Sequence, residues 1–310
     1  MTIRRFILTL VTTIAAIVAI DRLLTRLAGP LPQPVAGESS QIEVDGTTVT
    51  VTEAGSTEGQ ELVMVHSPYL GASSREFAAL SNALSDTHRM LLVDLPGYGR
   101  SDRPIDVNDI DRLTDAIASV IETSTDEPIL ITSGQAYPAA LAAAERTSID
   151  RLVAIGPRTE RGRTCPFRAS ILAAPVVGTA YNLVLTSRVM LNAHLSRTLE
   201  VPQRALTGDF LEYAWQSSHQ PGSRASMVAW IGGDLDVVES LDELAGDTEL
   251  EQAFIVGDRA GHPTVSAVRS AAERADTSVS VVSDTGAFPH LQAPDAVASH
   301  LNQSGLLARQ

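Results

Sequence analysis

The chain has 310 residues, of which 44% are hydrophobic and 19% charged, so it can bury a sizeable core. Its 23 basic residues are all arginine and stand against 37 Asp and Glu, and the net charge of −14 excludes a broad nucleic-acid-binding surface. The single cysteine, Cys165, excludes an intramolecular disulfide and a thiolate zinc site. Because a surface this acidic repels itself unless salt screens it, we expect a halophilic, acidic protein, the alternative being an ordinary acidic protein from a GC-rich gene.

The first predicted element is an apolar helix within residues 1–29. Two arginines, Arg4 and Arg5, precede an uncharged run from Phe6 to Ile20, which as a helix spans about 22 Å. Flanking leucines can extend the run and arginines can snorkel, so we expect a single-pass membrane anchor. The alternative is a cleaved signal peptide, although no convincing cleavage site follows. Arginines on both sides leave the side of the membrane undetermined.

A linker rich in Pro, Gly and Ser follows at residues 30–40, and the main domain is expected at 41–310. The segment "QIEVDGTTVTVTEAG" predicts a hairpin that turns at Asp45-Gly46. Six short apolar runs then alternate mostly with amphipathic stretches, which indicates a doubly wound α/β fold with a mostly parallel sheet. The region from about 156 to 246 lacks this rhythm and is expected to be an inserted helical cap. Within it, His219 and Arg224 bracket a Pro-Gly pair that we interpret as a plain turn rather than a site.

The stretch "DLPGYGRSDRP", Asp94 to Pro104, follows the second parallel strand and fits D-x-P-G-x-G-x-S. Together with "VMVHSPYLG", "GDRAGHP" and "GAFPHLQAPD", it resembles the α/β-hydrolase fold family of the AB hydrolase-1 type, over about residues 41–304. The resemblance implies a core sheet, a cap, and a serine nucleophile with an acid, a histidine base and an oxyanion hole. A fold likeness alone does not establish activity.

The nucleophile of such enzymes occupies a crowded turn between a strand and a helix, which requires small residues two positions before and after it. In "ILITSGQAYPAALAAA", Thr132 and Ala136 are the small flanking residues, and the position between them is Gly134. Shifting the register by one makes Ser133 the nucleophile but puts larger residues, Ile131 and Gln135, at the crowded positions. We favour the first register, in which the nucleophile position has no side chain.

The other positions that the resemblance assigns are also altered. The acid position in "GDRAGHP" is Ala260, the base position in "GAFPHLQAP" is Ala287, and the oxyanion position is Pro68, which has no N–H to donate. The residues nearest in sequence that could replace the acid and base are Asp258 and His290, the latter more readily interpreted as a capping or surface group.

We therefore expect a membrane-anchored pseudoenzyme of the α/β-hydrolase fold that lacks triad catalysis and acts in binding or scaffolding, with a small apolar ligand in the cleft between core and cap. The alternative is an active, esterase-like serine hydrolase that uses Ser133, Asp258 and His290 in a displaced arrangement. A cofactor-free enzyme of another type is a weaker third hypothesis. No spacing indicates a metal site or a cofactor, and no nucleic-acid partner is expected.

Overall fold

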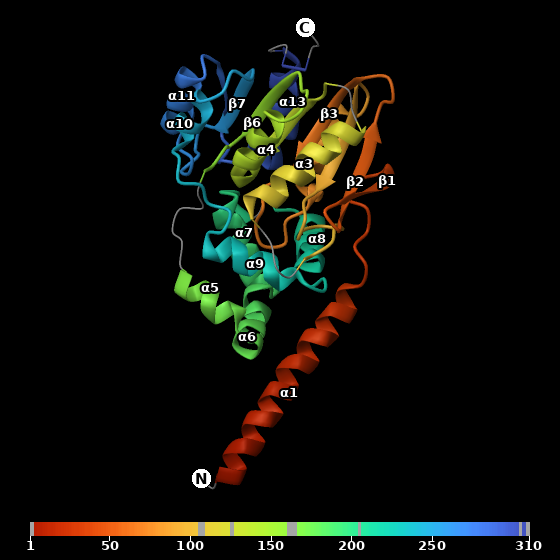
Figure 1. Ribbon diagram of the computed structural model, residues 1–310, viewed down its shortest axis with the longest axis vertical. Helices are drawn as coiled ribbons and strands as arrows, with labels where there is room; N and C mark the ends of the chain where they lie inside the picture. Colours follow the sequence, from red (N-terminus) through yellow and green to blue (C-terminus); the bar gives the residue numbers. More distant parts are fainter. Residues whose placement is uncertain are drawn as a thin grey trace.

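The computed structural model describes residues 3–104, 109–124, 127–159, 166–203, 206–303 and 306–307. Its centre is an eight-stranded sheet in the order β1-β2-β4-β3-β5-β6-β7-β8 (Figure 1). The first two strands join the sheet antiparallel, and the other six run parallel to one another. The strands are β1 (Glu38–Val44), β2 (Thr47–Gly55), β3 (Gln60–Val65), β4 (His88–Asp94), β5 (Ile129–Ser133), β6 (Arg151–Ile155), β7 (Gln252–Gly257) and β8 (Val279–Val282).

The predicted hairpin and the six predicted apolar strands are confirmed. Val44 pairs with Thr47, which leaves Asp45 and Gly46 as a two-residue turn, and both have positive φ angles of 47° and 72°. Such a turn matches the twist of the strands that it joins. All residues of β5, β6 and β7 are buried, as expected for central strands of a parallel sheet that is covered on both faces.

Two hydrophobic cores lie on the two faces of the sheet. One core is covered by the helices α3, α4 and α11, and the other by α2 and α13. The helices and short 3₁₀ turns of this layer are η1 (Ser74–Phe77), α2 (Ala78–Leu84), α3 (Ile110–Ser124), η2 (Gly134–Ala136), α4 (Tyr137–Ala144), α11 (Val265–Arg274), α12 (Pro289–Gln292) and α13 (Pro294–Gln303).

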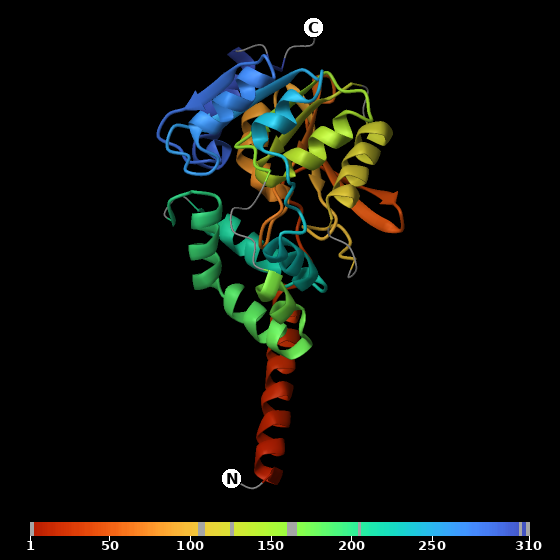
Figure 2. The same ribbon diagram turned by 60° about the vertical axis from the view of Figure 1, so that its left-hand side comes forward.

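A helical layer between β6 and β7 covers the carboxyl ends of the parallel strands (Figures 1 and 2). Ser217 of this layer donates to the carbonyl of Ala72 after β3, and Ser226 donates to the carbonyl of Gly97 after β4. The helices of this layer are α5 (Pro166–Ala173), α6 (Pro175–Leu185), α7 (Arg188–Thr198), α8 (Gly208–Ser218) and α9 (Ser223–Gly232), whereas α10 (Leu241–Gly246), which follows them in the chain, packs against α11 beside the sheet (Figure 1). This layer is the cap that the sequence predicts.

The predicted N-terminal helix is α1 (Ile3–Ala28), and it projects away from the rest of the molecule on the side of the cap (Figures 1 and 2). The stretch Ile7–Ala28 is long and apolar enough to cross a membrane, with a mean hydropathy of 2.0. A signal sequence has the same properties. Only the carboxyl-terminal part of α1 contacts the domain, where it meets α6 and α8.

Candidate active site

The turn after β5 places Gly134, and not Ser133, at its conformationally demanding position. Ser133 is the last residue of the strand and has extended backbone angles, φ −128° and ψ 148°. Gly134 has φ +50°, in the left-handed region that glycine enters without steric cost. An ideal Cβ on Gly134 would lie 2.5 Å from the Oγ of Ser67 and 2.7 Å from Cζ of Phe288. The space in which a side chain of residue 134 would begin is therefore occupied.

Ser67 also occupies the hydrogen-bonding position beside this turn. Its Oγ accepts a hydrogen bond from the backbone N–H of Gln135 at 3.1 Å. In α/β-hydrolases, the amide after the nucleophile and an amide from the loop after the third strand bind the oxyanion. Here the first of these amides, at Gln135, is bonded to a side chain of the protein, and Pro68 in the loop after β3 has no N–H.

Ser133 and His290 do come together, and a carboxylate that the sequence analysis missed lies between them. The Oγ of Ser133 donates a short hydrogen bond to the carboxylate of Glu76 and accepts one from the N–H of Ser67 at 2.9 Å. The Nε2 of His290 lies 3.1 Å from the same Glu76 oxygen. All three side chains are almost fully buried. In a serine triad the histidine stands between the serine and the acid, whereas here the acid takes the middle place.

Burial of this cluster corrects the interpretation of His290 as a surface or capping group. His290 belongs to α12, has no exposed surface, and its ring stacks on Phe77 with 5.0 Å between centroids. Phe288 is a second aromatic neighbour, at 5.8 Å. The buried Tyr69 lies beside Glu76, and its pKa is raised, first by burial and then by the charge of Glu76. No local sequence signal marks Glu76, because an acidic residue in "SREFAAL" is normally on the surface.

Asp258, Ala260 and Ala287 lie in the loops after β7 and β8. The exposed Asp258 accepts a hydrogen bond from the N–H of Thr285 at 3.3 Å, which joins the two loops. Ala260 makes a turn hydrogen bond to Gly257 at 3.2 Å. Ala287 is buried, and its carbonyl occupies the place that a Cβ on Gly156 would need. The structure thus brings together two of the three displaced candidates and leaves Asp258 out.

A cavity of about 400 Å³ lies between the core and the cap, next to this turn. Its most buried cation is Arg158, whose backbone N–H donates to the carbonyl of Gly134 at 2.9 Å and whose guanidinium lies 5.2 Å from the ring centre of Phe288. Glu200 lies 3.7 Å from Nη2, and among the described residues no hydrogen-bond acceptor reaches Nε or Nη2. Burial lowers the pKa of Arg158 to about 10. The other lining residues are Tyr181, Leu185, His194, Arg197, Thr198, Glu200, Trp230, Ile231 and His262.

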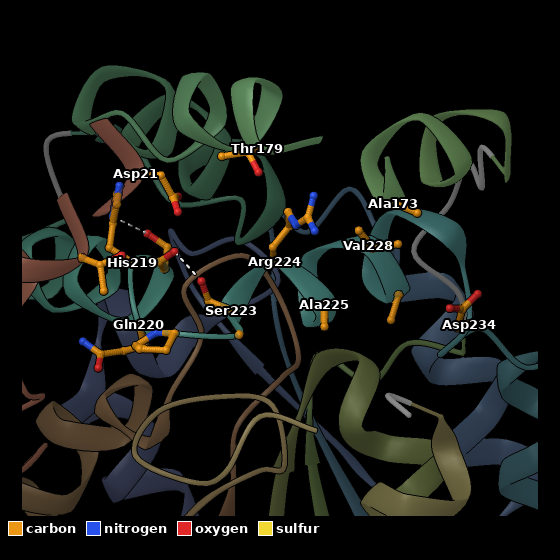
Figure 3. A pocket seen from close by; sticks show the side chains of 15 residues that line it. Asp21, Ala173, Thr179, His219, Gln220, Ser223, Arg224, Ala225, Val228 and Asp234 are labelled. Carbon is orange, nitrogen blue, oxygen red and sulfur yellow. Dashed lines mark hydrogen bonds between the residues drawn. The ribbon is translucent and has the colours of Figure 1, made fainter. Parts of the chain in front are cut away.

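A second cavity, of about 490 Å³, lies at the base of α1 (Figure 3). Asp21 of α1 lines one side of it, and the segment from Ser218 to Ala225 lines the other. The sequence interpretation of this segment as a turn agrees with Gly222, which has φ +84°. Arg224 donates to the carbonyls of Ala174 and Pro175 at 3.2 Å, and Nδ1 of His219 donates to the carbonyl of Trp215 at 2.8 Å. Both side chains therefore hold the cap together.

The chain belongs to the alpha/beta hydrolase family, whose sequence profile matches residues 62–300. This is the family that the D-x-P-G-x-G-x-S motif and the parallel sheet indicate. Among curated protein sequences, none matches this chain.

Solved structures share the fold at low sequence identity. Cfl2 from Burkholderia cenocepacia superposes with a TM-score of 0.70 at 16% identity, over 86% of this chain and 95% of its own. An esterase from Thermogutta terrifontis superposes with a TM-score of 0.67 at 15% identity, over 88% of this chain and 100% of its own. A bacterial membrane phospholipase A superposes with a TM-score of 0.65 at 18% identity, over 98% of each chain. At these identities the similarity establishes the fold alone.

Proposed function

We propose that this protein is a membrane-anchored member of the family that lacks triad catalysis and acts by binding or scaffolding. The observation that carries the proposal is the position of Ser67. Its hydroxyl fills the space beside Gly134 and accepts the hydrogen bond of Gln135, so that a nucleophile and an oxyanion amide are both missing from the place where the family has them.

The remaining positions support the same proposal. Ala260 and Ala287 can neither orient nor transfer a proton, and Pro68 cannot donate to an oxyanion. Loss of one oxyanion donor costs about 10²–10³ in rate, and an enzyme without a working triad retains at most about 10³–10⁴ over water, much of it from the oxyanion hole. Because the oxyanion hole and the triad positions are both altered in this chain, little rate enhancement is expected from either.

The apolar helix supports the membrane part of the proposal. We assign residues 1–29 to a single-pass anchor, 30–40 to a linker and 41–310 to the hydrolase-fold domain with its cap at about 156–246. A helix that exposes Ile7, Leu10 and Val11 to solvent has no partner within the described chain that would bury them, and a bilayer is the environment in which such a surface is stable.

The cavity beside Arg158 is the proposed ligand site. Its aromatic and aliphatic lining suits a small apolar body, as expected from the sequence, and the positive charges of Arg158 and Arg197 in the lining favour an anionic end group such as a carboxylate. The ligand class that fits best is therefore an apolar molecule with one anionic group. A phosphate monoester would suit less well, because Glu200 lies beside the same guanidinium.

The alternative function is an esterase-like serine hydrolase, and one observation favours it: Ser133, Glu76 and His290 form a hydrogen-bonded group in the turn where the family carries its nucleophile. The two functions differ in the reactivity of Ser133. A fluorophosphonate probe, which reacts covalently with an activated serine, is expected to leave the full-length protein unlabelled.

A further inference from the structure

Helix α6 has its apolar residues on the outside. Val177, Tyr181 and Val184 are spaced by four and three residues, so they form one face of the helix, and they are 54%, 40% and 56% exposed. The residues that the same helix buries are Gly178 and Asn182. A cap helix that faced water on this side would show the reverse distribution.

Three more apolar side chains are exposed on the neighbouring helices. Phe167 at the start of α5 is 74% exposed, and Val189 and Met190 at the start of α7 are 80% and 43% exposed. We call these six residues of α5, α6 and α7 the apolar cap face. Figure 2 shows α5 and α6 at the end of the molecule from which α1 leaves, and α6 packs against α1 itself. Thr179, on the opposite side of α6 from Val177 and Tyr181, lines the cavity at α1, so the apolar cap face turns away from α1 at the end of the molecule from which α1 leaves.

The charge of the sequence changes over the same segment. Residues 161–199 contain five arginines and no Asp or Glu, in a chain with 37 acidic residues among 310. An even distribution would place about five acidic residues in a segment of this length. The segment itself adds no carboxylate that the phosphates of a bilayer would repel, and the nearby Glu212 of α8 is paired with Arg188 at 2.8 Å.

The length of the uncharged run explains why the cap would reach the bilayer. Phe6 to Ile20 spans about 22 Å as a helix, less than the roughly 30 Å of a hydrocarbon core. The next residue, Asp21, already lines the cavity between α1 and the cap. The longer stretch Ile7–Ala28 can cross the bilayer, and if all of it is embedded, the base of α1 and the cap that contacts it lie in the interfacial layer.

We propose that the apolar cap face is a second membrane-contact surface, which lies in the headgroup and upper acyl region beside α1 and holds the cap against the bilayer. The proposal rests on the proposed membrane anchor and adds to it a fixed orientation of the domain. The occupant of the surface is lipid rather than a second copy of the chain.

Site-directed spin labelling of the full-length protein tests the proposal in vesicles of phosphatidylcholine and phosphatidylglycerol. In a Cys165→Ser background, single cysteines are introduced at Val184 in the apolar cap face, at Val11 in α1, and at Ser270 on the exposed side of α11 as the matched control. Collision with oxygen, which concentrates in lipid, is compared with collision with a water-soluble nickel complex. We expect Val184→Cys to favour oxygen and to lie roughly 5–10 Å below the headgroups, whereas Ser270→Cys favours the nickel complex.

The Val11 label separates this proposal from the anchor on which it rests. If Val11→Cys reports lipid and Val184→Cys is as accessible to nickel as Ser270→Cys, the anchor stands and the second contact surface is wrong. If Val184→Cys is shielded from both reagents, a protein occupant covers the face and the proposal is again wrong. If neither Val11→Cys nor Val184→Cys reports lipid, both proposals fall. Because Val184 and Ser270 are exposed, their substitution should not disturb folding.

Discussion

The hydroxyl of Ser67 lies 2.5 Å from the position that a Cβ on Gly134 would occupy, so the Ser67 side chain and a side chain at residue 134 cannot both be present as the turn stands. A side chain at 134 requires the removal of Ser67, and Ser67 is accommodated because residue 134 has none. The hydroxyl of Ser67 thus fills the part of the turn in which a side chain of residue 134 would begin.

This relationship predicts the stability of a restored nucleophile. Gly134→Ser should lower the free energy of unfolding by about 2–4 kcal/mol, because serine at φ +50° is strained and also overlaps Ser67 and Phe288. The matched control is Gly46→Ser, at φ +72° with no atom near its Cβ, for which strain alone predicts a loss of about 1 kcal/mol. Chemical denaturation of the two variants measures the difference.

The double variant Ser67→Gly/Gly134→Ser should recover part of that loss, with a coupling of about 1 kcal/mol or more. Simple additivity of the two substitutions would show that Ser67 is not the residue that excludes a side chain at 134. Neither variant should gain esterase activity, since a serine without a base is an ordinary alcohol.

The buried hydrogen bonds of Glu76 predict that its substitution lowers the free energy of unfolding strongly. Glu76→Ala leaves the Ser133 hydroxyl and the ring of His290 without their shared acceptor in a site closed to water, and the free energy of unfolding should fall by about 3 kcal/mol. Glu239→Ala, at an exposed loop position, is the control and should change it by less than about 0.5 kcal/mol. Equal effects of the two substitutions would show that the buried hydrogen bonds contribute nothing.

The position of Arg158 in the cavity predicts that its substitution weakens the binding of an apolar anion and that this binding depends on pH. Binding of 8-anilinonaphthalene-1-sulfonate, an apolar anion, should weaken about tenfold in Arg158→Met, because the guanidinium is the most buried cation of the cavity. Arg259→Met, which removes an exposed arginine paired with Asp284, is the control. Fluorescence titration that gave the same affinity in Arg158→Met and in the wild type would place the ligand elsewhere.

Because burial lowers the pKa of Arg158 to about 10, its positive charge is present below that pH and is lost as the pH rises through it. Affinity for the anion should therefore be constant near neutrality and fall as the pH approaches 10. The effect of the Arg158 pKa on the free energy of unfolding has the opposite sign to its effect on ligand affinity. Since the unfolded arginine holds its proton to a higher pH than the folded one, deprotonation favours the folded state above pH 10.

The net charge of −14 predicts a dependence of stability on salt. Screening shortens from about 10 Å at 0.1 M to 3 Å at 1 M salt, which reduces repulsion among the carboxylates, so the melting temperature of the full-length protein in detergent should rise across this range. A melting temperature that does not change would remove the argument for a halophilic protein and favour the explanation from gene composition.

The fold could be predicted from the sequence because its signals are local. The Asp45-Gly46 turn and the six apolar strands need only neighbouring residues to be recognised, and the D-x-P-G-x-G-x-S motif indicated the family. Steric requirements within five residues also favoured Gly134 over Ser133 as the residue in the turn.

The site could be predicted only in part, because its decisive contacts join distant parts of the chain. Glu76 meets Ser133 across 57 residues and His290 across 214, and an isolated acidic residue in an amphipathic stretch gives no sign of burial. The role of Ser67 was equally hidden, since only the folded chain places its hydroxyl against Gly134 and Gln135.

The reaction of the full-length protein with a fluorophosphonate probe tests the central claim, the absence of triad catalysis, most directly. The probe is followed by intact mass, with an active serine hydrolase of the family as the positive control. We predict no covalent adduct, because residue 134 carries no oxygen and the Ser133 hydroxyl is buried and donates to Glu76 rather than to a histidine. Stoichiometric labelling that disappears in Ser133→Ala would contradict the account and identify the protein as an active serine hydrolase.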